Sequence, residues 1–123
     1  MATKCKTTAS KTIVAEMMAS DPSIRRSGFA AAMRGLSDSN ILAKAASAII
    51  PDAFSINDDE VVLYEVADTH PIRANKAQHI ANLADEMDEI GRLLRVVVID
   101  YTGHVIADTP GWSYGGSHTD AFA

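Results

Sequence analysis

The spacing of apolar residues changes near the middle of the chain, from the three- and four-residue steps of a helix face to the alternation of a strand. Before Pro51 the pattern predicts three helices, over residues 12–19, 22–36 and 40–49. Pro22 suits the first turn of the second helix, where a missing N–H costs no intrahelical hydrogen bond. The expected core-facing residues of the three helices are Ile13, Val14, Met17, Phe29, Ala32, Met33, Leu36, Leu42, Ala45, Ala46 and Ile49.

After Pro51 the pattern predicts short strands and one long helix. In chain order these are strands at residues 53–57 and 60–67, a helix at 75–90, and strands at 95–101 and 104–108. The first two strands should form a hairpin around the turn residues 57–59. The strand at 95–101 is apolar on both faces, which is typical of a central strand.

These elements predict an α/β fold with a small mixed β-sheet flanked by helices and a helical N-terminal third. We expect a single domain at residues 12–108, between a flexible basic arm at residues 1–11 and a glycine-rich tail at residues 109–123. The length of 123 residues leaves no room for a second core of ordinary size.

Composition and charge narrow the class of protein. Hydrophobic residues make up 47% of the chain, enough for a real core, and no apolar run reaches the ~20 residues of a membrane helix. A single cysteine, Cys5, excludes an internal disulfide. With no secretory signal pattern, we expect a cytoplasmic protein that has no membrane partner. A net charge of −5 argues against tight, sequence-independent duplex binding of the histone-like kind.

One constellation of residues carries chemistry. Pro51-Asp52 is followed, after twelve residues, by Glu65 on an apolar strand, and then by a helix and another apolar strand. Two carboxylates from neighbouring strands can share one hard cation such as Mg²⁺ or Mn²⁺, which activates water for phosphodiester hydrolysis. The order of these residues and elements resembles the PD-(D/E)xK nuclease superfamily, which implies a restriction-endonuclease-like core. By this resemblance the backbone carbonyl of Val66 is a third metal ligand.

The sequence departs from the family pattern at one residue. The lysine expected two positions after the acid is Ala67 here. Some members of the superfamily supply the amine from a nearby helix, and Lys76 fits that role. It precedes the apolar residues of the 75–90 helix at helical spacing, at the head of the core-facing stripe Ile80, Leu83, Met87 and Ile90. The neighbouring Gln78 and His79 are candidate phosphate-binding residues.

Each of these residues also has a structural interpretation. Asp52 can simply cap a turn, Lys76 can extend its amine to solvent, and Glu65 on an edge strand would need no partner. A pairing of Glu65 with Arg73 or Arg92 would indicate a structural ion pair. The remaining histidines form no metal-ligand pattern, and Trp112 and Tyr114 in the tail suit either base stacking or a core edge.

The resemblance implies a Mg²⁺-dependent nuclease acting on DNA, with Asp52, Glu65 and Lys76 as catalytic residues. A second reading is a catalytically inactive protein of the same fold that binds or inhibits a protein partner, which Ala67 and the net charge favour. A third is a phage structural component of unrelated fold. The sequence also resembles small phage proteins, which implies the host cytoplasm, and relatives of the fold often act as homo-oligomers. Walker, G-x-S-x-G and dinucleotide motifs are absent from the sequence.

Overall fold

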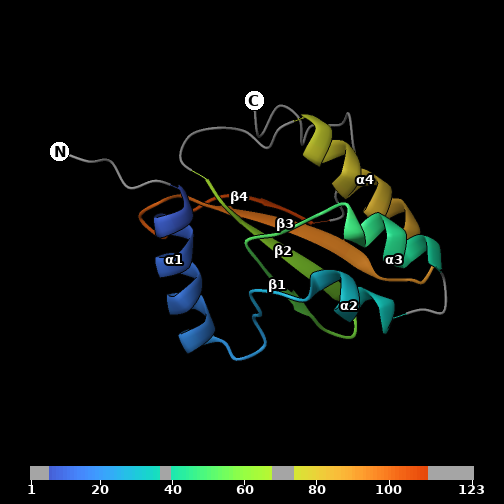
Figure 1. Ribbon diagram of the computed structural model, residues 1–123, viewed down its shortest axis with the longest axis horizontal. Coiled ribbons are helices and arrows are strands. Elements are labelled where there is room, and N and C mark those ends of the chain that lie inside the picture. The colour runs from blue at the N-terminus through green and yellow to red at the C-terminus, as the bar shows by residue number, and fades with distance from the viewer. Residues whose placement is uncertain (1–5, 37–39, 68–73, 111–123) are drawn as a thin grey trace.

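The structure is a computed structural model that describes residues 6–36, 40–67 and 74–110. Three helices in the first half of the chain are followed by two strands, a helix and two further strands (Figure 1). The elements are α1 (Lys6–Ser20), α2 (Phe29–Arg34), α3 (Asn40–Ser47), β1 (Ala53–Ile56), β2 (Glu60–Val66), α4 (Ala74–Asp88), β3 (Leu93–Ile99) and β4 (Val105–Thr109). The predicted α/β class and the helical N-terminal third are confirmed.

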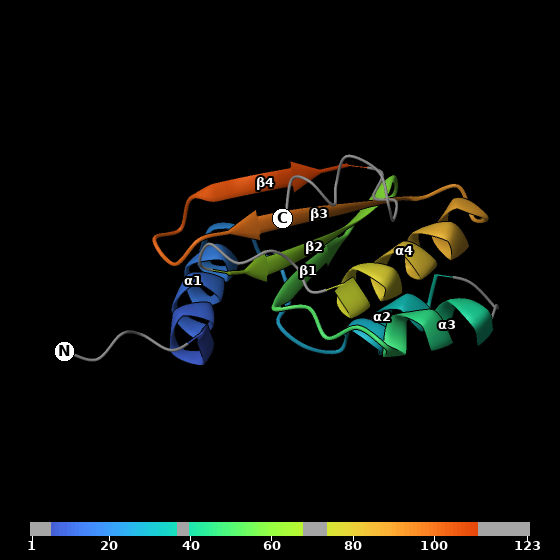
Figure 2. The same ribbon diagram turned by 90° about the horizontal axis from the view of Figure 1, so that it is seen from above.

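The four strands form one mixed sheet in the order β1-β2-β3-β4 (Figure 2). Strands β1 and β2 form an antiparallel hairpin, β2 and β3 are parallel, and β3 and β4 are antiparallel. Helix α4 makes the crossover between the two parallel strands. The predicted hairpin and the central position of β3 are therefore confirmed.

The two faces of the sheet are covered by different helices (Figure 1). Helix α1 packs on one face against the even-numbered residues of β2, Val62 and Val66. Helices α2, α3 and α4 pack on the other face, where Leu63 of β2 and Val96 of β3 are fully buried. The Asn57 side chain stabilises the hairpin turn by accepting hydrogen bonds from the two N–H groups at residues 59 and 60, each at 2.8 Å. A buried layer on each side leaves β2 and β3 with little contact with water.

The N-terminal boundary was predicted incorrectly. Helix α1 begins at Lys6, so residues 6–11, expected in a basic arm, are helical. Residues 6–11 carry no apolar stripe, and periodicity alone therefore gave no signal for the first turns. Residues 1–5, with Cys5, lie outside the part that the structure describes. The predicted contact residues Ile13 and Val14 are buried as expected.

The start of the second helix was also predicted incorrectly. Asp21 accepts hydrogen bonds from the N–H and hydroxyl of Ser23, which fold residues 21–24 into a turn. Arg25 then pairs with Phe54 of β1 through two backbone hydrogen bonds of 2.8 and 2.9 Å. Helix α2 starts only after Gly28, whose φ of 85° suits a residue without a side chain. The long-range pairing of Arg25 with Phe54 therefore keeps this segment extended, although Pro22 locally favours the start of a helix.

Other boundaries agree within two or three residues, and most expected core residues are buried or half-buried. Thr109 belongs to β4 and is buried, so it is not part of the predicted tail. His70, Arg73, Trp112, Tyr114 and the rest of the tail from residue 111 lie outside the described residues. Within the described ranges, each helix is too short or too polar to cross a bilayer.

Candidate functional site

Asp52 and Glu65 face each other where the β1–β2 ladder ends. The antiparallel register pairs Ala53 with Tyr64, so its next step places Asp52 opposite Glu65. There the pairing continues through side chains. Asp52 Oδ2 accepts a hydrogen bond from the N–H of Val66 at 2.7 Å, and Glu65 Oε2 accepts one from the N–H of Asp52 at 3.3 Å. Each carboxylate is thus held by a backbone N–H of the opposite segment.

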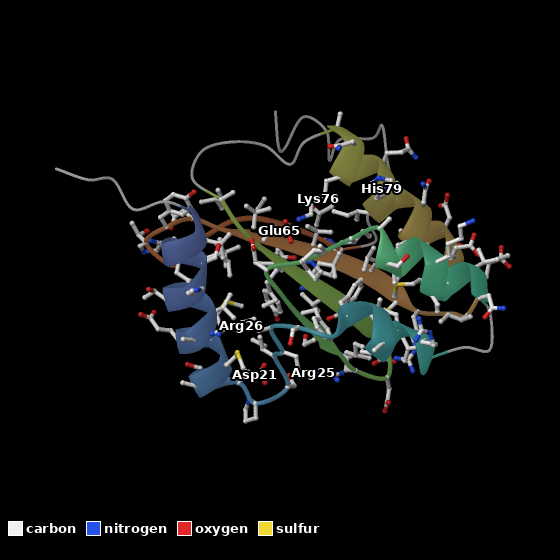
Figure 3. The ribbon with its side chains drawn as sticks, viewed as in Figure 1. Asp21, Arg25, Arg26, Glu65, Lys76 and His79 are labelled. Atoms are coloured by element: carbon white, nitrogen blue, oxygen red, sulfur yellow. The ribbon has the colours of Figure 1, made fainter. Side chains whose placement is uncertain are left out.

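Lys76 approaches the carboxyl groups from the first turns of helix α4. Its Nζ forms an ion pair with Glu65 Oε1 and donates a hydrogen bond to the carbonyl of Ile50 at 3.3 Å. Figure 3 shows the Lys76 and Glu65 side chains directed toward one another from α4 and β2. Ile80 and Leu83, four and seven positions later, are fully buried and fix the rotation of the helix. The predicted direction of the Lys76 amine is confirmed, and its catalytic role stays a prediction.

Residue 67, an alanine, lies on the same face of the sheet on which the Lys76 amine reaches Glu65. Side chains alternate along a strand, so Ala67 lies on the same face as Glu65, and it packs against the α2–α4 core. Its N–H continues the β2–β3 pairing by donating to the carbonyl of Ile99 at 2.9 Å. A lysine at residue 67 would therefore extend from the face of the sheet that α4 covers. The Lys76 amine approaches Glu65 on this same face.

Burial makes the charge of Glu65 the main electrostatic feature of the site. The Glu65 side chain is 5% exposed and that of Lys76 is 29% exposed. A buried ionised carboxylate is costly unless hydrogen bonds and an opposite charge compensate its lost hydration. Lys76 supplies both here. The alternative partner Arg92 instead donates to the carbonyl of Asn57, and Arg73 lies outside the described residues.

The donor set suits a hard divalent cation that retains water. Among the described residues, no group of three or more histidine, cysteine, aspartate or glutamate side chains is arranged to hold a metal ion. A cation at this site would thus have Asp52 and Glu65 as side-chain ligands, with the carbonyl of Val66 as the predicted third ligand. Mg²⁺ usually keeps several waters and takes one or two carboxylates. A carboxylate has about four lone-pair sites, so a carboxylate that accepts a hydrogen bond can also bind a cation.

The two predicted substrate-binding residues are placed differently. Gln78 is exposed and its Nε2 donates to Asn82 Oδ1 at 2.9 Å. Two helical positions correspond to about 200°, which turns Gln78 away from the Lys76 side of α4. His79 is exposed, one turn along the helix from Lys76 (Figure 3). The structure therefore brings Asp52, Glu65 and Lys76 together, and Gln78 stands apart.

Sequence reasoning missed two parts of the site. The first is the carbonyl of Ile50, since a backbone acceptor has no residue-type signature. The second is a groove of about 320 Å³ beside the site, here called the α2–α3 groove, lined by residues 26–31, Ser47 and residues 49–51. The groove has no residue-type signature either, because it arises from the packing of two short helices.

Comparison with known proteins gives no assignment. The chain matches no family model, no curated protein and no solved structure. The resemblance to the PD-(D/E)xK superfamily therefore rests on the sequence pattern alone.

Proposed function

We propose that the protein is a metal-dependent nuclease of the PD-(D/E)xK type, with a restriction-endonuclease-like core, that hydrolyses phosphodiester bonds in DNA. The observation that carries the proposal is the meeting of Asp52, Glu65 and Lys76, which come from a connection, a strand and a helix. The sequence pattern indicated the same three residues. The strand–helix–strand unit of β2, α4 and β3 follows the family's order and supports the same assignment.

Each residue has a distinct task in this proposal. Asp52 and Glu65 hold the divalent cation, and the bound cation supplies charge neutralisation and a more acidic water. Lys76 pairs with the buried Glu65, and its amine is positioned to stabilise negative charge that develops on the scissile phosphate. The Val66 N–H fixes the orientation of the Asp52 carboxylate.

Cleavage assays test the proposal directly. Plasmid, linear and branched DNA are incubated with Mg²⁺ or Mn²⁺ and with the native chain, Glu65→Gln, Asp52→Asn or Lys76→Gln. We expect metal-dependent cutting by the native chain and at least a hundredfold loss in each variant, since each removes a charged group from the site. Glu60→Gln is the matched control, because Glu60 lies on the same strand in a different ion pair and should leave cutting unchanged.

A second candidate is an inactive protein of this fold that binds a protein partner. The low exposure of Glu65 and its direct pairing with Lys76 favour it, because the pair is satisfied without a metal. Absence of metal-dependent cutting by the native chain on all three DNA forms would support this candidate. Cutting that persists in Glu65→Gln would exclude the proposed site.

A further inference from the structure

The α2–α3 groove is continuous with the candidate site through three consecutive residues. Ile50 and Pro51 line the groove, and Asp52 follows them directly. The carbonyl of Ile50 is also an acceptor for Lys76 Nζ at 3.3 Å. A ligand that fills the groove would therefore lie next to a phosphate held by Lys76 and by a cation on Asp52.

The groove lining combines apolar walls with one cation. Phe29, Ile49 and Pro51 give apolar surface, and the Ile50 side chain at the rim is 86% exposed. Arg26 is the cation among the lining residues, and Ser27 and Ser47 add hydroxyl groups. Such a surface suits a ligand with one flat apolar part and one anionic part.

Charge is distributed unevenly along the chain, in favour of an anion here. Residues 22–51 carry four cations and one carboxylate in a protein of net charge −5. The cations are Arg25, Arg26, Arg34 and Lys44, and the carboxylate is Asp38. The Arg25 guanidinium lies 5.1 Å from the Phe54 ring centroid, so Arg25 has a packing role, whereas Arg26 lines the groove.

We propose that the α2–α3 groove is a subsite for one unpaired nucleotide of a DNA strand, adjacent to the phosphate at the candidate site. Arg26 contacts a backbone phosphate, and the base lies against Ile50 and the apolar wall. A base stacked inside a duplex has no free face to offer, so the groove selects single-stranded or frayed DNA. This inference rests on the proposed function, and it names the substrate structure.

Binding measured without cleavage tests the subsite. Fluorescence anisotropy of a labelled oligo-dT strand and of a hairpin duplex of equal length is recorded with the full chain in EDTA, over a range of salt. We expect tighter binding of the single strand. Arg26→Gln should weaken single-strand binding about fivefold to tenfold, and lower the salt slope by about 0.7 for one lost phosphate contact.

Matched variants separate the groove from general charge and hydrophobicity. Arg34→Gln removes a cation outside the groove lining, and Ile41→Asn changes an exposed isoleucine on α3 that does not line it. Both should bind the single strand within about twofold of the native chain, whereas Ile50→Asn should weaken binding severalfold. Equal effects of Arg26→Gln and Arg34→Gln, or a preference for the duplex, would overturn the subsite.

Failure of the subsite and failure of the proposed function give different results. If Glu65-dependent cutting occurs and Arg26→Gln binds normally, the nuclease stands and the subsite is wrong. If Arg26→Gln loses single-strand binding while no cutting occurs, the groove binds DNA but the chain is not a nuclease. Absence of single-strand binding by the native chain would refute the subsite and direct attention to a protein ligand.

Discussion

Two glutamates on the same strand, Glu60 and Glu65, form ion pairs of different kinds. The Glu60 side chain is 24% exposed and lies 3.3 Å from Arg95, a residue of the adjacent strand that is also 3.4 Å from Asp108. Glu65 is almost fully buried and is paired with a residue of the crossover helix. A partly exposed pair adds little to stability, whereas a buried carboxylate without its cation is strongly unfavourable.

The two pairs therefore differ in the cost of burying the carboxylate. This cost is small for Glu60, whereas the rest of the fold must compensate it for Glu65. The Glu65 position lies among Leu63, Val61 and other apolar residues on the α2–α4 face, where an apolar side chain would pack without that cost. Retention of a carboxylate there is consistent with a role other than stability.

The largest expected effect comes from removing the cation of the buried pair. Lys76→Met removes the cation that pairs with the buried Glu65, and should lower the free energy of unfolding by about 2 kcal/mol. Urea unfolding measures this change. Glu60→Gln, which breaks the partly exposed pair, should cost less than about 1 kcal/mol. Equal losses in the two variants would remove the distinction between the pairs.

A double variant sharpens the comparison. Glu65→Leu combined with Lys76→Met replaces the buried pair by apolar groups, and should recover most of the stability that Lys76→Met loses. DNA cutting should remain absent, because both charged groups are gone. Urea unfolding and the cleavage assay are run on the same preparations. A double variant no more stable than Lys76→Met would show that packing, not charge, holds the site.

The smallest effect concerns Asp100, a partly exposed carboxylate that is stabilised by hydrogen bonds. The Thr102 hydroxyl and the His104 N–H hold the pKa of Asp100 below its usual 3.8. A lowered pKa adds stability that is present above pH 3.8 and is lost as pH falls through the folded-state value. The difference in unfolding free energy between the native chain and Asp100→Asn should therefore be smaller at pH 2.5 than at pH 7. A difference that does not change with pH would contradict the assignment.

The second half of the fold could be predicted well because its signals are local. The β-branched residues of β2 and β3 and the four- and three-residue steps after Lys76 each follow from neighbouring residues. The same spacing indicated the direction of the Lys76 amine. The candidate site was predictable to the extent that it depends on which face of a strand or helix each residue occupies.

The parts that failed depend on partners far away in the sequence. The chain around Arg25 is extended because it pairs with Phe54, and no local feature of residues 22–28 announces that pairing. The role of the Ile50 carbonyl depends on how β1 is placed against α4. The α2–α3 groove arises from the packing of two short helices, which a one-dimensional pattern does not describe.

The origin of Lys76 on a helix has a consequence for how the site tolerates change. An amine on a strand is aimed by the pleat of its own backbone, whereas the amine of Lys76 is aimed by the seating of the whole of α4 on the sheet. A rotation of α4 by one residue, about 100°, would carry the amine off Glu65. Substitutions at Ile80, Leu83 or Met87 would thus displace the Lys76 amine, because they change how α4 packs on the sheet. In this protein the packing of α4 on the sheet therefore constrains both the core residues beneath the helix and the chemistry of the site.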